Sequence, residues 1–226
     1  MIYITGDTHG DITDLQKKAK GLTGDDILII AGDFGFDWDG LTIKTWLQTR
    51  KPYTVLFCDG NHENFDILDS LPKEERFGSE VGRFDGRTFR LLSGHMYTIG
   101  GLRFFVFGGA SSIDRRDRIP GKSWWPEEIP PFRVFKKAED TLAENGWKFD
   151  IFLSHTCNPE VKKKVLGPYA MDFYDPVESM IESLEAGIRT NGGGYREHYF
   201  GHLHEDKDFG NEHCLYNRTV CIEEAT

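Results

Sequence analysis

The chain has 226 residues and a formal net charge of −10, with 27 Lys and Arg against 37 Asp and Glu. It lacks the cationic excess that neutralises the phosphates of long nucleic acids, so nucleic-acid binding is not expected. No apolar stretch approaches the roughly 20 residues needed to span a bilayer, and the four cysteines form no CxxC pair that would indicate a zinc ribbon or thioredoxin site. Because residues 2–4 read as a strand rather than a signal peptide, we expect a cytoplasmic protein.

The first 60 residues alternate between strand-like and helix-like patterns. Continuous apolar runs predict buried strands over 2–4, 26–31 and 53–58, and helical spacing predicts helices over 13–20 and 41–50. This order is typical of βαβ units, which form a parallel sheet with its functional loops at the carboxyl ends of the strands.

The remainder of the chain mixes short β runs with two helices. Runs over 88–92, 96–99 and 103–107, separated by glycine-containing turns, predict antiparallel hairpins. Further strands are predicted over 149–153, 197–200 and 218–222, and helices over 132–145 and 175–188. No linker or charge block divides the sequence, so residues 1–226 are expected to form one domain with two packed sheets flanked by helices.

Five polar patches each follow a β run. They are Asp7-Thr8-His9, Gly32-Asp33, Gly60-Asn61-His62-Glu63, Ser154-His155-Thr156 and Gly201-His202-Leu203-His204. Side chains at strand ends can converge on one point, so these patches can build one compact site. Imidazole and carboxylate donors suit Mn, Fe, Zn, Ni or Co better than Ca or Mg. Two such ions about 4 Å apart form a clamp for phosphoryl chemistry.

The order DxH, GD, GNHE, H and GHxH resembles the calcineurin-like metallophosphoesterase superfamily over residues 7–204. The resemblance implies an α/β fold, a four-layer α/β/β/α sandwich with two central mixed sheets. It also implies a dinuclear metal-dependent hydrolase of phosphomono- or phosphodiesters, acting on a phosphorylated small molecule or a phosphopeptide.

The resemblance assigns roles residue by residue. Asp33 would bridge both metals, hydroxide between the ions would attack phosphorus, and His62 would be the general acid that protonates the leaving alkoxide. The remaining ligands would be Asp7, His9 and His204 at the first metal and Asn61, His155 and His202 at the second. By contrast, an isolated histidine is usually an ordinary core or surface residue, which is our interpretation of His95, His198 and His213.

The sequence departs from the Ser/Thr protein phosphatases of this superfamily. They read GDxVDRG around the bridging aspartate and carry Arg before GNHE, whereas this chain has Phe34-Gly35 after Asp33 and has Asp59 before Gly60. A protein phosphatase is therefore the alternative rather than the first expectation. A non-catalytic scaffold is less favoured still, because every ligand and the acid are present.

Three arginines lie in a segment without clear periodicity. Arg115, Arg116 and Arg118 could bind phosphate oxygens, since guanidinium groups pair with them in a bidentate manner. Trp124 and Trp125 could wall a pocket beside them. The alternative is a surface loop with its own aromatic cluster, and the sequence favours neither.

Overall fold

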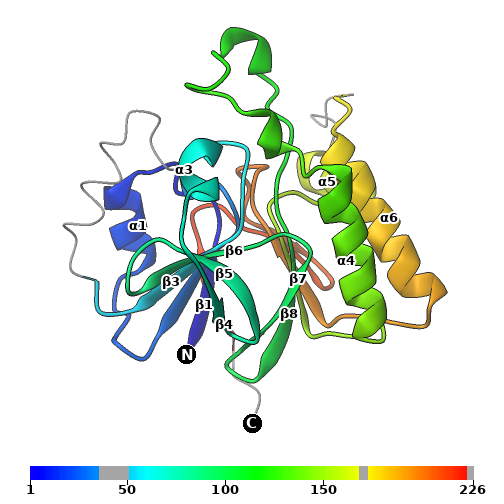
Figure 1. Ribbon diagram of the computed structural model, residues 1–226, viewed down its shortest axis with the longest axis horizontal. Coiled ribbons are helices and arrows are strands. Elements are labelled where there is room, and N and C mark those ends of the chain that lie inside the picture. Colours follow the sequence, from blue (N-terminus) through cyan, green and yellow to red (C-terminus); the bar gives the residue numbers. More distant parts are fainter. Residues whose placement is uncertain (36–50, 168–172, 223–226) are drawn as a thin grey trace.

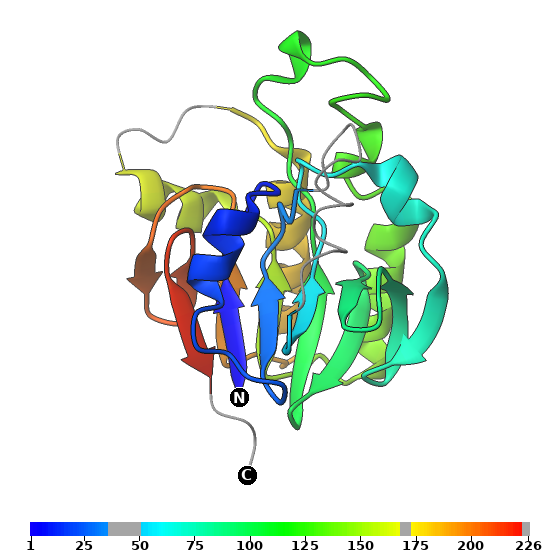
Figure 2. The same cartoon turned by 90° about the vertical axis from the view of Figure 1, so that its left-hand side faces the viewer.

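The computed structural model describes residues 1–35, 51–167 and 173–222. Two stacked sheets form its centre, and helices cover both outer faces (Figures 1 and 2). The helix predicted over 41–50 lies outside the described residues. No helix in the described ranges is long and apolar enough to cross a membrane.

The first sheet has seven strands in the order β13-β1-β2-β3-β6-β5-β4. Its parallel centre consists of β1 (Ile2–Thr5), β2 (Ile27–Ile30), β3 (Thr54–Phe57) and β6 (Thr88–Leu91). Antiparallel strands complete both sides: β13 (Thr219–Ile222), β5 (Ser79–Arg83) and β4 (Lys73–Arg76). The predicted strands 2–4, 26–31 and 53–58 all lie in this parallel centre.

The second sheet has six strands in the order β11-β12-β10-β9-β8-β7. Its parallel members are β8 (Leu102–Phe107), β9 (Ile151–Ser154), β10 (Glu197–Phe200) and β12 (Glu212–Cys214). The antiparallel members are β7 (His95–Ile99) and β11 (Lys207–Phe209). Both sheets are therefore mixed, as expected.

One hairpin prediction was wrong. Of the three runs between residues 88 and 107, β7 and β8 pair as an antiparallel hairpin, but β6 pairs in parallel with β3 in the other sheet. The Ser93-Gly94 turn therefore carries the chain from one sheet to the other. Turn residues predict a reversal of direction, but the partner of each strand depends on contacts distant in the sequence.

Side-chain alternation along the buried strands produces the layers. Ile29 and Phe104 belong to the core between the sheets, whereas their neighbours Ile30 and Phe105 face the outer helical layers. A continuous apolar run is therefore required, because both faces of each central strand are covered.

Two helical layers complete a four-layer α/β/β/α sandwich. On the first sheet lie α1 (Ile12–Lys18) and α3 (Phe65–Asp69), and on the second lie α4 (Phe132–Glu144) and α6 (Pro176–Thr190). A short helix, α5 (Pro159–Leu166), packs with Phe200 and Cys214 beside the second sheet. The long loop between β8 and α4 rises above the sandwich in both views (Figures 1 and 2).

Candidate metal centre

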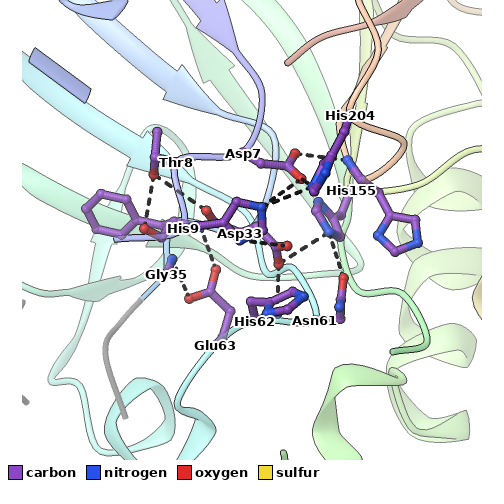
Figure 3. Close-up of polar contacts among 12 residues, drawn as sticks. Asp7, Thr8, His9, Asp33, Gly35, Asn61, His62, Glu63, His155 and His204 are labelled. Carbon is purple, nitrogen blue, oxygen red and sulfur yellow. Dashed lines mark hydrogen bonds and ion pairs between the residues drawn. The ribbon is translucent and has the colours of Figure 1, made fainter. Parts of the chain in front are cut away.

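The five polar patches meet at one edge of the sandwich. They follow β1, β2, β3, β9 and β10, whose carboxyl ends point the same way because the strands are parallel within each sheet. Side chains from residues nearly 200 positions apart consequently face one another (Figure 3).

The backbone at this edge is held in an uncommon conformation. His9, Asp33, His202 and His204 have φ angles of +46°, +46°, +64° and +52°. Non-glycine residues seldom adopt the left-handed region, and residues that do so cluster at functional sites. Four of the seven predicted ligands therefore share this feature.

Three glycines in the motifs allow the ligand loops to touch. A Cβ added at Gly60 would lie 2.0 Å from Oδ1 of Asp33, and one at Gly201 would lie 2.1 Å from Oδ1 of Asp7. At Gly32 it would lie 2.1 Å from Nδ1 of His155. These positions require glycine because the backbone packs directly against a donor side chain.

The first group of donor atoms surrounds Asp7. Nε2 of His204 lies 3.1 Å from Oδ2 of Asp7 and 3.1 Å from Nε2 of His9. Nδ1 of His9 lies 3.7 Å from Oδ2 of Asp33. Donors that share one metal at about 2.1 Å and at right angles are about 3 Å apart, so the spacing of Asp7, His204 and Nε2 of His9 suits a shared cation, whereas Asp33 faces the other nitrogen of the His9 ring.

The second group surrounds His155. Its Nε2 lies 3.3 Å from Oδ1 of Asp33 and 3.1 Å from Oδ1 of Asn61. Its Nδ1 contacts the Ala31 carbonyl at 2.9 Å, so Nδ1 carries a proton and donates it. That bond directs Nε2 toward the two oxygens and leaves its lone pair for a metal.

His202 completes this side of the site. Its ring centroid lies 5.0 Å from that of His155. Burial and the neighbouring His155 lower the pKa of His202 to about 4, which keeps the imidazole neutral and able to bind a cation. All seven predicted ligands thus lie together.

The charges around Asp7 and His155 favour a bound cation. Oδ2 of Asp7 is buried, and its near neighbour among the described residues is Nε2 of the predicted ligand His204 at 3.1 Å. Burial alone would lower the pKa of His155, but the adjacent Asp33 carboxylate raises it to about 10, so Asp33 stabilises positive charge at Nε2, either as a proton or as a cation that replaces the proton. A divalent ion among these oxygens and nitrogens would replace the proton on His155 and balance the buried Asp7 and Asp33 carboxylates.

Backbone amides fix the two carboxylates. The N–H of His62 donates to Oδ1 of Asp33 at 2.8 Å, and the N–H of His202 donates to Oδ1 of Asp7 at 2.9 Å. Burial favours the neutral acid, yet His155 outweighs it and holds the pKa of Asp33 well below its usual range. Asp33 is therefore an ionised carboxylate in a buried place, where a counter-cation is needed.

The sequence did not reveal which residues support the ligands. The Asn61 amide donates from Nδ2 to Oγ of Ser112 at 3.1 Å, and Ser112 donates in turn to the buried Glu128 carboxylate at 2.6 Å. This series of hydrogen bonds orients the Asn61 side chain so that its Oδ1 faces His155. Both carboxylate oxygens of Glu63 accept the backbone N–H groups of Phe34 and Gly35, and so hold the loop that follows Asp33.

The three predicted arginines occupy different places, and one of them contacts the predicted acid. Nη2 of Arg118 lies 3.0 Å from both ring nitrogens of His62, and Asp114 holds the same guanidinium through Nε at 2.8 Å. Arg115 instead lies over the Trp124 ring, 4.1 Å from its centroid, and Arg116 is exposed. Of the three, only Arg118 contacts a predicted site residue among the described residues.

The two tryptophans and His198 lie outside the predicted site. Both Trp124 and Trp125 are buried, at 7% and 5% exposure, and neither is among the described residues that line the pocket at the metal centre. His198 is a core residue between Ser154 and Glu212, at 2.7 Å from each. Asp59, which stands before Gly60 where the protein phosphatases carry Arg, forms a bidentate ion pair with Arg90.

A sequence-family comparison agrees with this arrangement. A family model described as calcineurin-like phosphoesterase matches residues 1–206. The chain belongs to this family. Membership indicates a hydrolase of phosphate esters, and the matched range includes all five ligand patches. No curated protein sequence matches the chain closely enough to add to this assignment.

Proposed function

We propose that the protein hydrolyses phosphomono- or phosphodiesters with two divalent metal ions, each drawn from Mn, Fe, Zn, Ni or Co. One observation carries the proposal: donors from five loops form two neighbouring groups, with Asp33 between them, its Oδ1 toward His155 and its Oδ2 toward His9. The first group would be held by Asp7, His9 and His204, and the second by Asn61, His155 and His202. The mixture of imidazole, carboxylate and amide oxygen favours these metals over Ca and Mg.

The bound ions would lower the pKa of a water molecule and neutralise charge on the phosphoryl oxygens. The protein supplies the geometry. Asp33 directs Oδ1 toward one donor group and Oδ2 toward the other, and the Ser112–Glu128 chain orients the Asn61 oxygen.

His62 would supply the proton for the leaving alkoxide. Its ring lies beside the donors, 5.0 Å from the His9 ring between centroids, while its backbone holds Asp33. Arg118, itself held by Asp114, fixes the imidazole and adds positive charge where the leaving oxygen would develop negative charge. Binding of substrate by Arg115 and Arg116 stays a prediction from sequence.

A substrate comparison tests the proposal. Metal-depleted protein would be assayed with p-nitrophenyl phosphate, bis(p-nitrophenyl) phosphate and a phosphopeptide, before and after addition of Mn²⁺. We expect turnover only with metal, and fastest on one of the two small esters. Highest kcat/KM for the phosphopeptide would favour the protein phosphatase alternative. Tight metal binding without turnover would instead favour a scaffold.

A further inference from the structure

A pocket of about 370 Å³ opens directly from the metal centre. Asp33, Asn61 and His62 are among the residues on its metal side. The pocket is also lined by four apolar side chains from four different segments, which together form its apolar wall: Ile113, Leu166, Phe173 and Leu203.

This apolar wall is anchored in the fold. Leu166 and Leu203 are partly buried against the small core formed by α5, Phe200 and Cys214. Lys162 connects α5 to the start of α6, because its Nζ pairs with Oε1 of Glu178 at 2.7 Å and donates to the Phe173 carbonyl at 3.4 Å. Leu166, Leu203 and the Phe173 backbone are therefore positioned before any ligand arrives.

The charges on this wall are already paired within the protein. Lys162 is bound to Glu178, and Asp114 is bound to Arg118. The residues that the structure describes here present apolar surface to the pocket, together with the paired side chains of Asp114, Lys162 and Glu178. Such a wall favours an uncharged apolar group over an anionic one.

Ile113 is the clearest part of this wall. Its side chain is 64% exposed although it is large and apolar, and it lies one residue from Ser112, which supports Asn61. Exposed apolar side chains are common singly, but this one faces a pocket beside reactive groups. Contact with a substrate would cover it.

We propose that this pocket binds the alcohol part of the substrate, and that this part is apolar and uncharged, either aromatic or branched aliphatic. The inference rests on the proposed function. An acid must lie within about 3 Å of the oxygen that it protonates, so the leaving oxygen belongs at His62. The carbon attached to that oxygen then extends from His62 into the pocket toward Ile113 and Phe173.

Pairs of esters with alcohols of similar acidity test the proposal. Benzyl phosphate would be compared with methyl phosphate, and benzyl methyl phosphate with dimethyl phosphate, on the metal-loaded full chain. We expect kcat/KM to be at least about 10-fold higher for the benzyl ester, the size of effect that apolar pockets give. A ratio near one while methyl and p-nitrophenyl esters are hydrolysed would overturn this inference and leave the proposed function standing.

Two variants locate the effect in this pocket. Ile113→Asp should reduce the benzyl-to-methyl ratio about 10-fold, because it places a charge where the ring would pack. Ile119→Asp is the matched control, since Ile119 is 58% exposed on the same loop and is not among the described lining residues. Equal loss in both variants, or loss in neither, would contradict the assignment.

A binding measurement decides the matter even if no ester is hydrolysed. Calorimetric titration with benzylphosphonate and methylphosphonate measures the affinity of the pocket without requiring turnover. We expect tighter binding of benzylphosphonate with a more negative heat-capacity change, the signature of apolar burial. Equal affinities for the two phosphonates would refute the pocket assignment. Absence of turnover on every ester would separately refute the proposed function.

Discussion

The two walls of the site are built in different ways. On the metal side, Asp33 is 1% exposed and Asn61 5%; Asp33 accepts a hydrogen bond from the His62 backbone, and Asn61 donates one to Ser112. On the apolar side, Ile113 is 64% exposed, and the apolar wall is assembled from the ends of loops and helices. The first wall is fixed by backbone and buried polar contacts, and the second by apolar packing.

This difference separates chemistry from selectivity. Metal ligands must be placed accurately because small displacements are costly in rate. An apolar wall tolerates more variation, because the hydrophobic effect depends on buried area rather than on direction. Substitutions on the metal side should therefore abolish turnover, whereas those on the apolar side should change substrate preference or stability.

The largest effect is expected for Asp33→Ala. Both donor groups lose the carboxylate that they share, so metal content should fall for both ions and kcat by more than about 1,000-fold. Loss of a single stabilising donor alone costs about 100- to 1,000-fold. Elemental analysis and turnover of p-nitrophenyl phosphate would measure this. Asp25→Ala, at an exposed position, is the control and should retain both properties.

His62→Ala should keep both metals and lose turnover selectively. A positioned general acid contributes about 100- to 10,000-fold, so hydrolysis of an alkyl ester should fall by that factor. The p-nitrophenyl ester should suffer much less because its leaving group needs little protonation. If metal content fell with activity, the role of His62 as the acid would be wrong.

Gly60→Ala tests the close packing of the metal side. The added methyl group would meet Oδ1 of Asp33 at 2.0 Å and displace the carboxylate. We expect about a 100-fold loss of kcat/KM, as for a displacement of about 1 Å. Gly86→Ala is the matched control, because nothing lies within 4 Å of a Cβ there. Similar losses in both variants would mean that glycine flexibility, rather than this contact, matters.

The smallest effect is expected for Glu178→Gln on the apolar side. Burial raises the pKa of Glu178 to about 7, although Lys162 opposes the shift. The folded protein therefore binds a proton that the unfolded chain releases above about pH 4.3, and this contribution to stability is lost as pH rises toward 7. The stability difference is about 2 kcal/mol over this range, so the Tm of the wild type relative to the variant should fall by about 4–8 °C between pH 5 and 7.

Thermal melts at several pH values would follow this change. Glu182→Gln, an exposed substitution on the same helix, should show no such trend. A difference between wild type and Glu178→Gln that stays constant with pH would exclude titration of this carboxyl over that range.

The metal side could be predicted from the sequence, and most of the apolar side could not. The runs that form β1, β2 and β3 are continuous and apolar, and the motifs directly follow them, so the local sequence pattern was sufficient.

The edge strand β4 reads Lys-Glu-Glu-Arg and has no such pattern. It forms through its partner β5, which sequence periodicity does not reveal.

Contacts between distant segments account for the other omissions. The bond from Asn61 to Ser112 spans 51 residues, and the contact between His62 and Arg118 spans 56. The apolar pocket joins residues from 113 to 203. Three arginines in one loop gave no reason to prefer Arg118 over Arg115, because only the loop geometry directs one to His62 and the other to Trp124.

Metal titration of the depleted protein tests the central claim most directly. Mn²⁺ would be added in small steps while hydrolysis of p-nitrophenyl phosphate and its bis-ester is followed. If two ions share Asp33, activity should be absent without metal and should reach its maximum at two equivalents per chain. Turnover by the metal-free protein, or full activity at one equivalent, would contradict the account.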